Sequence, residues 1–248
     1  MSKSLVEWVK GDGSRPPIVV TAAWKGGDGK STLGYEVAYQ LGSILTDFDW
    51  DKGGCSMSWG FRAEHRVRAP LLEAFERGKT PTPLQGKRKP DLIPSHPDFG
   101  LNQPAPNKVA DGLEQWARDL DSPLSVDCHP GGCDSTYGAL QAANTVLVPA
   151  VLADKSLNAL EGMLEELTDY PLLIIPYMVK SPPARLRKRL RDMTARFGIP
   201  VGPVVSYYPW IPARSRRMAI CSEPVSKQAM PFVRQIDAVV DAVINYDA

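Results

Sequence analysis

The chain has 248 residues, and its 29 Lys and Arg stand against 28 Asp and Glu, which gives a formal net charge of +1. This balance excludes a protein that coats nucleic acid through its bulk charge, but it leaves room for a local basic patch. Hydrophobic residues make up 43% of the chain and charged residues 23%, which is typical of a globular protein and excludes global disorder. The length fits one large domain or two small ones.

No apolar run has the length of a signal-peptide core or of a transmembrane helix. We therefore expect a cytoplasmic protein without a membrane anchor. The four cysteines form no Cys-x-x-Cys pair and the three histidines are scattered, so no zinc motif is evident. We expect reduced thiols at all four cysteines, which are Cys55, Cys128, Cys133 and Cys221.

Short apolar runs alternate with amphipathic segments along the chain. After a polar lead-in over residues 1–15, the predicted elements are a strand over 18–23, a helix over 31–41, a strand over 43–49, helices over 70–77 and 110–120, a strand over 124–127, a helix over 137–143, a strand over 145–149, a helix over 156–168, a strand over 172–176, a helix over 183–197, a strand over 204–206 and a helix over 231–246. This alternation predicts an α/β fold whose mainly parallel sheet carries helices on both faces. We see no repeat and no separating linker, so we expect a single domain over residues 1–248.

The strongest motif is the glycine-rich turn Lys25-Gly-Gly-Asp-Gly-Lys-Ser-Thr32, between the first strand and the first helix. It ends like the phosphate-loop pattern G-x-x-x-x-G-K-[ST], but Trp24 stands where that pattern has its first glycine. The glycines let backbone N–H groups point at phosphate oxygens, next to the positive end of the helix dipole. Lys30 can reach the β and γ phosphates, and the Ser31 hydroxyl can bind Mg²⁺. A chance Gly- and Lys-rich turn is disfavoured by the position between strand and helix.

Carboxylates follow two other predicted strands. Alternation along the second strand places Asp47 and Asp49 on the same side, and Asp127 ends a third apolar strand. Ligands bind beyond the carboxyl ends of strands in open α/β sheets, so these groups can hold Mg²⁺ and position an attacking water. An acidic turn without a catalytic role is the alternative for Asp47 and Asp49. A Cys/His catalytic pair at Cys128 and His129 is disfavoured, because adjacent residues of a strand point to opposite faces.

The glycine-rich turn resembles the deviant Walker A motif of the ParA/MinD family of P-loop ATPases. The resemblance implies ATP and Mg²⁺ as cofactors and an ATP-bound homodimer. It also implies that Lys25 reaches across the dimer interface to the partner's nucleotide. The implied nucleotide contacts within the loop are Gly26, Gly27, Asp28, Gly29, Lys30, Ser31 and Thr32.

The acidic segments resemble further motifs of the same family. The segment around Asp47 is similar to the D-x-D-P-Q motif, which implies that Asp49 orients the hydrolytic water and that Asp47 lies near the metal. Asp127 matches the Walker B carboxylate, which holds Mg²⁺ through water. The catalytic residues implied are therefore Lys25, Lys30 and Asp49, and the implied metal ligands are Ser31, Asp47 and Asp127.

Three residues depart from the family pattern. Trp50 and Asp51 stand where the D-x-D-P-Q motif has Pro and Gln, and His129 replaces the first proline of the D-x-P-P segment. The resemblance nevertheless extends over most of residues 18–245 and is weakest over residues 53–110. Because the phosphate loop begins at residue 25, we expect no helix-turn-helix domain before it. The implied base contacts are Pro212, Tyr177 and Met178.

Arginines gather late in the chain, on the predicted helix over 183–197 and in the segment that follows Pro212. Leu186, Leu190 and Met193 recur at helical spacing, so most of the basic side chains on this helix point outward. Such a patch can bind DNA phosphates without reading sequence, and a solvated basic face is the alternative. The candidate DNA-binding residues are Arg185, Arg187, Lys188, Arg189, Arg191, Arg214, Arg216 and Arg217.

The last predicted helix is apolar on one side and mainly acidic on the other, with Asp237 and Asp241 against Arg234. Anionic lipid repels such a helix, so we expect it to pack on its own domain rather than on a membrane. We therefore predict a nucleoid-associated, ParA-type partition ATPase for plasmids or chromosomes. Its hydrolysis is expected to be stimulated by a ParB-like, centromere-binding partner. The alternatives are a positioning ATPase for a protein cargo, a metabolic P-loop enzyme of the same fold and a nucleotide-binding scaffold without hydrolysis.

Overall fold

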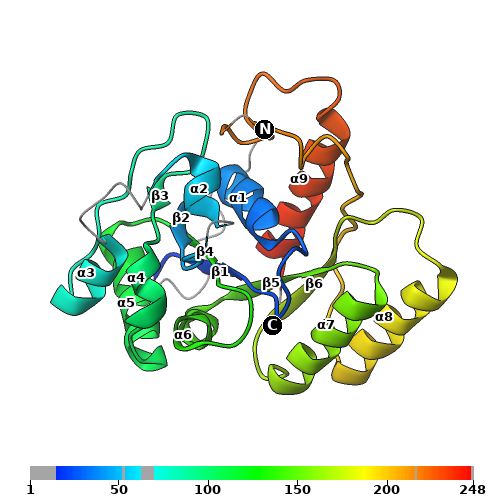
Figure 1. Ribbon diagram of the computed structural model, residues 1–248, viewed down its shortest axis with the longest axis horizontal. Helices are drawn as coiled ribbons and strands as arrows, with labels where there is room; N and C mark the ends of the chain where they lie inside the picture. Colours follow the sequence, from blue (N-terminus) through cyan, green and yellow to red (C-terminus); the bar gives the residue numbers. More distant parts are fainter. Residues whose placement is uncertain (1–14, 52–53, 63–69, 216, 247–248) are drawn as a thin grey trace.

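Apolar segments of the chain pair into one parallel sheet in the computed structural model, which describes residues 15–51, 54–62, 70–215 and 217–246 (Figure 1). The order of its six strands is β3-β2-β4-β1-β5-β6, and every pair is parallel. The strands are β1 (Ile18–Thr21), β2 (Ile44–Asp47), β3 (Leu92–Ile93), β4 (Leu124–Asp127), β5 (Thr145–Ala150) and β6 (Leu172–Pro176). All of their residues are buried, as expected for a parallel sheet with two covered faces. The predicted α/β fold is confirmed.

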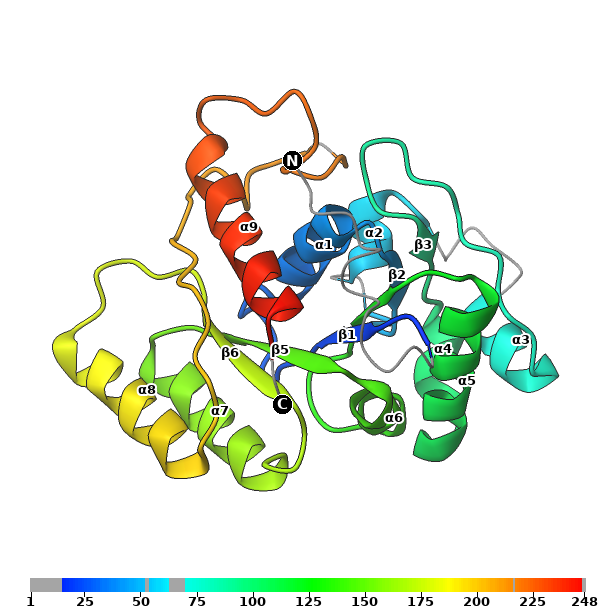
Figure 2. The same cartoon turned by 180° about the vertical axis from the view of Figure 1, so that it is seen from behind.

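Helices cover both faces of the sheet (Figures 1 and 2). In the described residues they are α1 (Lys30–Leu41), α2 (Cys55–Trp59), α3 (Pro70–Arg77), α4 (Pro97–Leu101), α5 (Pro106–Asp119), α6 (Asp134–Ala142), α7 (Asp154–Glu166), α8 (Ala184–Phe197) and α9 (Met230–Ile244). Alternate residues of β1 point to opposite faces. Ile18 and Val20 join the core formed with α5 to α8, whereas Val19 joins the core formed with α1 and α9.

The fold brings the carboxyl ends of β1, β2 and β4 together. Asp127 is in register with Thr21 of β1 on one side and with Asp47 of β2 on the other. The chain leaves β1 through α1 on one face and leaves β4 through α6 on the other face. Adjacent strands whose connections depart in opposite directions leave a crevice at their carboxyl ends, which is where ligands bind in this class of fold.

Most predicted elements lie where the sequence placed them, but one prediction is wrong. The segment over 204–206 does not form a regular strand. It makes one isolated bridge, between Val179 and Ser206, and Val205 donates a single backbone hydrogen bond to Pro176 at the end of β6. Elements β3, α2 and α4 were not predicted, since each spans two to five residues and is too short to show a period.

Two helices begin three or four residues earlier than predicted. The helix predicted over 110–120 starts at Pro106, because proline fits the first helical turn, where its missing N–H is not needed. The helix predicted over 137–143 starts at Asp134, an acidic residue in the first turn. The predicted lead-in over residues 1–15 lies outside the described residues except for Arg15.

Helix α9 packs on the body of the protein, as predicted. Its apolar residues Phe232, Ile236 and Val239 are fully buried and share a core with Leu33 and Val37 of α1. Within the described ranges, no helix combines the length and the apolar character that crossing a membrane requires.

Candidate nucleotide and magnesium site

The glycine-rich turn adopts a conformation that requires glycine. Gly27 and Gly29 have φ values of +88° and +84°, in the left-handed region that residues with a side chain rarely adopt. A Cβ added at Gly29 would lie 2.3 Å from the ring of Tyr177, so this position also needs glycine for space. Gly29 is the N-cap of α1, so the turn ends with the first free N–H groups of the helix. These groups are suited to an anion.

Lys30 lies at the centre of a buried cluster of charges. Its side chain is 5% exposed, and its Nζ is 2.7 Å from Asp127 Oδ1 and 3.5 Å from Asp49 Oδ2. Burial lowers the pKa of Lys30, but the charges of Asp127 and Asp49 outweigh it and raise the pKa overall. Lys30 is therefore a cation that compensates the carboxylates at the strand ends.

Asp47 and Asp127 face each other from adjacent strands. Asp47 is fully buried and accepts the backbone N–H groups of Asp49, at 3.0 Å, and of Ser56, at 2.5 Å. Burial, followed by the charge of Asp127, raises the pKa of Asp47. Asp127 Oδ2 is buried and has no hydrogen-bond partner among the described residues. An unpartnered carboxylate oxygen between two acidic groups fits a divalent cation with oxygen ligands, so the residues present suit Mg²⁺.

β2 ends at Asp47, so Asp49 lies just beyond the strand. The sequence had predicted a strand over 43–49, which would have included Asp49. Its carboxylate is 6% exposed; one oxygen pairs with Lys30 and the other accepts the N–H of Asp51 at 3.1 Å. Burial raises the pKa of Asp49, and the charge of Lys30 partly offsets this. The loop after β2 therefore holds the Asp49 carboxylate against Lys30.

Lys25 is held by its own subunit. Its Nζ donates to Ser156 Oγ at 2.9 Å and lies 3.5 Å from Asp28 Oδ1, and the Ser156 hydroxyl donates to the same Asp28 oxygen at 3.0 Å. Asp28 is buried, whereas the Lys25 side chain is 40% exposed. Lys25 can therefore swing away from this contact without unfolding the loop.

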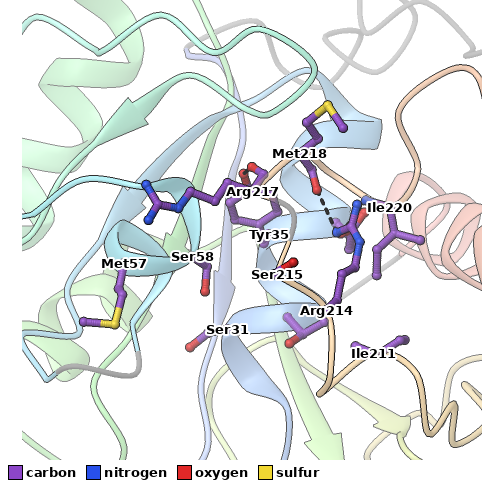
Figure 3. A pocket seen from close by; sticks show the side chains of 12 residues that line it. Ser31, Tyr35, Met57, Ser58, Ile211, Arg214, Ser215, Arg217, Met218 and Ile220 are labelled. Carbon is purple, nitrogen blue, oxygen red and sulfur yellow. Dashed lines mark hydrogen bonds between the residues drawn. The ribbon is translucent and has the colours of Figure 1, made fainter.

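A pocket of about 240 Å³ opens beside the first turns of α1 (Figure 3). One wall of this pocket is formed by residues late in the chain, among them Ile211, Arg214 and Met218. The buried Glu36 carboxylate anchors this wall by accepting the N–H groups of Ile220, at 2.8 Å, and Cys221, at 3.0 Å. Arg214 points along the same wall and donates to the carbonyl of Met218 at 2.7 Å. The lining residues are Ser31, Thr32, Tyr35, Glu36, Met57, Ser58, Ile211, Arg214, Ser215, Arg217, Met218 and Ile220.

The pocket changes the interpretation of several predicted residues. Arg214 and Arg217, which we predicted to bind DNA as a second cluster beyond the basic helix, line this pocket. Arg216 lies outside the described residues. Pro212 adjoins a lining residue but does not line the pocket itself.

The two other predicted base contacts lie elsewhere. Tyr177 is 3% exposed and packs against Gly29, beneath the turn, and the half-buried Met178 borders the same core. The wall residues Glu36, Met57 and Ser58 were missed, because their neighbourhood depends on long-range packing rather than on a local motif.

Helix α8 carries its basic residues on the surface, as predicted, but carboxylates neutralise most of them. Arg185 binds Asp154 of α7 through two hydrogen bonds, at 2.6 and 2.7 Å. Arg189 binds Glu161 at 2.7 Å, and Lys188 binds an acid of its own helix. Two arginines of α8 make no ion pair with any described residue. They are Arg187, which donates to the carbonyl of Pro182, and Arg191.

The alternative of a Cys/His catalytic pair is not supported. Cys128 is fully buried, and burial raises the pKa of its thiol far above the ordinary value. The imidazole of His129 instead stacks on Trp50, with ring centroids 3.9 Å apart. A thiol held protonated in the core is not a nucleophile.

No family model and no curated protein matches the chain. Among solved structures, the McdA(D38A)–ATP complex of Cyanothece has a TM-score of 0.75 and 17% identity, over 95% of this chain and 99% of that chain. The MinD cell division protein of Aquifex aeolicus has a TM-score of 0.70 and 19% identity, over 94% and 98%. A putative plasmid partition protein of Borrelia burgdorferi B31, bound to AMPPNP, has a TM-score of 0.69 and 16% identity, over 92% and 98%. The chain therefore has the P-loop fold of the McdA, MinD and plasmid-partition proteins.

Proposed function

We propose that the chain is a Mg²⁺-dependent ATPase of the ParA/MinD type. The observation that carries this proposal is the meeting of Lys30, Asp49 and Asp127 at the carboxyl ends of three adjacent strands, beside a turn built for phosphate. The unpartnered oxygen of Asp127 adds a place for the cation. The fold shared with proteins that were solved with ATP or AMPPNP bound supports the same proposal.

The residues of the site perform the reaction by exchanging contacts. When ATP enters, the Nζ of Lys30 leaves Asp127 and Asp49 for the β and γ phosphates, while N–H groups of the turn bind the remaining oxygens. Asp127 and Asp47, with the Ser31 hydroxyl, would hold Mg²⁺, which would supply positive charge to the phosphates when bound. Asp49, released from Lys30, accepts a hydrogen bond from the attacking water and orients it toward the γ phosphate.

We propose that two ATP-bound subunits associate and that Lys25 of each one contacts the partner's phosphates. In the single chain, Asp28 and Ser156 hold this lysine. The partner's phosphates offer a larger negative charge than Asp28, so they can draw the exposed amine away. This exchange makes association depend on the nucleotide.

The basic face of α8 is the proposed DNA-binding surface. Arg187 and Arg191 are the arginines of this face that no described carboxylate neutralises, so they attract phosphates at the least cost. Binding to Arg185 and Arg189 requires DNA to displace Asp154 and Glu161. We therefore expect weak, sequence-independent binding that falls steeply with salt.

A DNA-binding assay across a salt series, with ATP, with ADP and without nucleotide, tests this part of the proposal. We expect binding with ATP alone, and loss of binding in the double variant Arg187→Glu/Arg191→Glu. The matched control is Lys79→Glu/Lys108→Glu, which makes the same charge change at two exposed positions, one just after α3 and one on α5. Equal losses in the two double variants would mean that net charge, not the α8 face, governs binding.

A positioning ATPase for a protein cargo is the second candidate function. The ion pairs between α7 and α8 favour it, because they leave the predicted DNA surface only weakly basic. A ParB-like partner that stimulates hydrolysis belongs to the partition proposal, and a cargo-bound protein partner belongs to this one. ATP-dependent association without DNA retention at low salt would favour the cargo protein.

A further inference from the structure

The three residues that depart from the family motifs lie next to one another in the fold, although they follow two different strands. Trp50 and Asp51 follow β2, and His129 follows β4. The rings of Trp50 and His129 stack at an interplanar angle of 3°, with their centroids 3.9 Å apart. His129 Nε2 lies 3.3 Å from Asp51 Oδ2. The departures therefore form one structural unit beside the candidate nucleotide site.

This unit presents metal-ligating atoms at one point. A carboxylate oxygen from each of Asp49 and Asp51 and a ring nitrogen of His129 all lie within 4.8 Å of one another. Ligands on opposite sides of a cation are about 4.2 Å apart, given bonds of about 2.1 Å, so small side-chain rotations complete the set. The Asp51 side chain is 69% exposed, which leaves the remaining coordination positions open to water.

The imidazole of His129 is oriented before any ligand arrives. Trp50 fixes the plane of the ring by stacking, and Trp50 itself packs edge-on against Phe99 of α4. A Cβ at Gly100 would lie 2.7 Å from the indole, so the glycine at this position permits the close approach. A pre-oriented imidazole loses little freedom on binding a cation, which strengthens the site.

We propose that Asp49, Asp51 and His129 bind a divalent transition-metal cation of the Mn²⁺ to Zn²⁺ series. This site is separate from the Mg²⁺ site proposed at Ser31, Asp47 and Asp127. Mg²⁺ takes oxygen ligands and keeps its waters, whereas an imidazole nitrogen favours the transition metals. Asp49 also pairs with Lys30, so it connects the proposed transition-metal site with the candidate nucleotide site.

A regulatory consequence rests on the proposed ATPase activity. If Asp49 orients the attacking water, a cation on its carboxylate prevents this and slows hydrolysis. The cation also competes with Lys30 for Asp49, so it binds more tightly once Lys30 has moved to phosphate. Metal binding itself depends on neither statement and can be tested without nucleotide.

Cobalt(II) absorption in the visible range tests the site directly. The full-length, nucleotide-free protein is treated with a chelator and titrated with Co²⁺ in excess Mg²⁺, which fills the oxygen-only sites. We expect one Co²⁺ per chain, with a ligand-field spectrum that includes a nitrogen ligand. His129→Gln and Asp51→Asn should each weaken binding at least about tenfold.

The matched control is His96→Gln, which removes a histidine whose Nδ1 lies 3.5 Å from a single carboxylate oxygen, that of Asp98. This variant should bind Co²⁺ like the unmodified protein. Thermal unfolding checks that each variant is folded, as expected for the partly exposed positions of Asp51 and His129. Absence of Co²⁺ binding, or equal affinity in all three variants, would overturn the proposal. Neither result would affect the ATPase proposal, which is tested by hydrolysis in Mg²⁺ alone.

Discussion

Replacing Lys30 with methionine tests the buried charge cluster at the strand ends. Methionine has nearly the length of lysine and removes the charge without a large cavity. Lys30 is 5% exposed, and it is the cation that lies between Asp127 and Asp49 in the structure. Without it, these two carboxylates stay buried beside Asp47, and no other described residue forms an ion pair with either of them.

The size of the effect follows from the burial of the pair. Removing one partner of a buried ion pair costs about 3–5 kcal/mol. A change of 1 kcal/mol shifts the melting temperature of a chain of this size by about 2–4 °C. The nucleotide-free Lys30→Met protein should therefore unfold about 6–20 °C below the unmodified protein. It should also lose nucleotide binding, because no other residue replaces the amine at the phosphates.

A second variant separates stability from nucleotide binding. In Lys30→Met/Asp127→Asn the partner charge is removed as well, so at least half of the lost stability should return, while ATP binding stays absent. Scanning calorimetry of the nucleotide-free proteins and titration with ATP measure the two quantities. The reasoning is refuted if Lys30→Met unfolds within 2 °C of the unmodified protein, a limit set by about 1 kcal/mol. It is also refuted if the double variant is no more stable than the single one.

Three further variants test individual roles. Asp49→Ala should bind ATP but release no phosphate, because no carboxylate orients the water; normal turnover would remove Asp49 from this role. Asp28→Asn weakens the ion pair that holds Lys25 in the single chain, so less ATP should be needed for dimer formation. The ATP concentration at half-saturation should fall by about two- to fivefold, which corresponds to the free energy of an exposed ion pair. An unchanged concentration, measured by light scattering, would mean that Asp28 does not restrain the lysine. Burial and the charge of Asp127 raise the pKa of Asp47 to about 7, so the melting temperature of the nucleotide-free protein should fall as the pH rises through that value. Asp47→Asn should remove this part of the fall, although the variant also loses one of the two carboxylate oxygens that accept backbone N–H groups. The same variant should hydrolyse ATP more slowly, and an equal fall in melting temperature between about pH 6 and pH 8 in the two proteins would contradict the raised pKa.

Local patterns were sufficient to predict the glycine-rich turn between the first strand and the first helix, and five of the six strands in the described part of the sheet. Lys30 and Gly29 stand in a short motif between a strand and a helix, and Asp127 ends an apolar run, so neighbours along the chain define their places. Parallel pairing then brings Asp47 into register with Asp127. No knowledge of distant contacts is needed for these positions.

Long-range packing decides the features that the sequence did not reveal. The acids that neutralise α8 come from α7, and Asp154 and Arg185 are 31 positions apart. Arg214 lies at the pocket because the buried Glu36 anchors its segment from α1. Such partners have no fixed spacing, so composition and periodicity predict that the arginines cluster but not what they face.

Very short elements, of two to five residues, could not be predicted from the sequence either. β3 has only Leu92 and Ile93, and it forms because these residues pair with Leu45 and Thr46 of β2. A run of this length has no period, and the tertiary partner supplies its structure. The segment over 204–206 shows the reverse case, because its apolar residues do not extend the ladder of β6 and its isolated bridge is made by Ser206.

We propose that ATP, held by Lys30 and the strand-end carboxylates, drives association of two chains. Sedimentation of the Asp49→Ala protein with ATP and Mg²⁺ tests this most directly, since hydrolysis cannot reverse the association. We predict a particle of twice the 27.2 kDa chain mass with ATP, and a single chain with ADP, without nucleotide or in Lys30→Met/Asp127→Asn. A mass of one chain at saturating ATP, or a dimer that forms equally without nucleotide, would contradict the account.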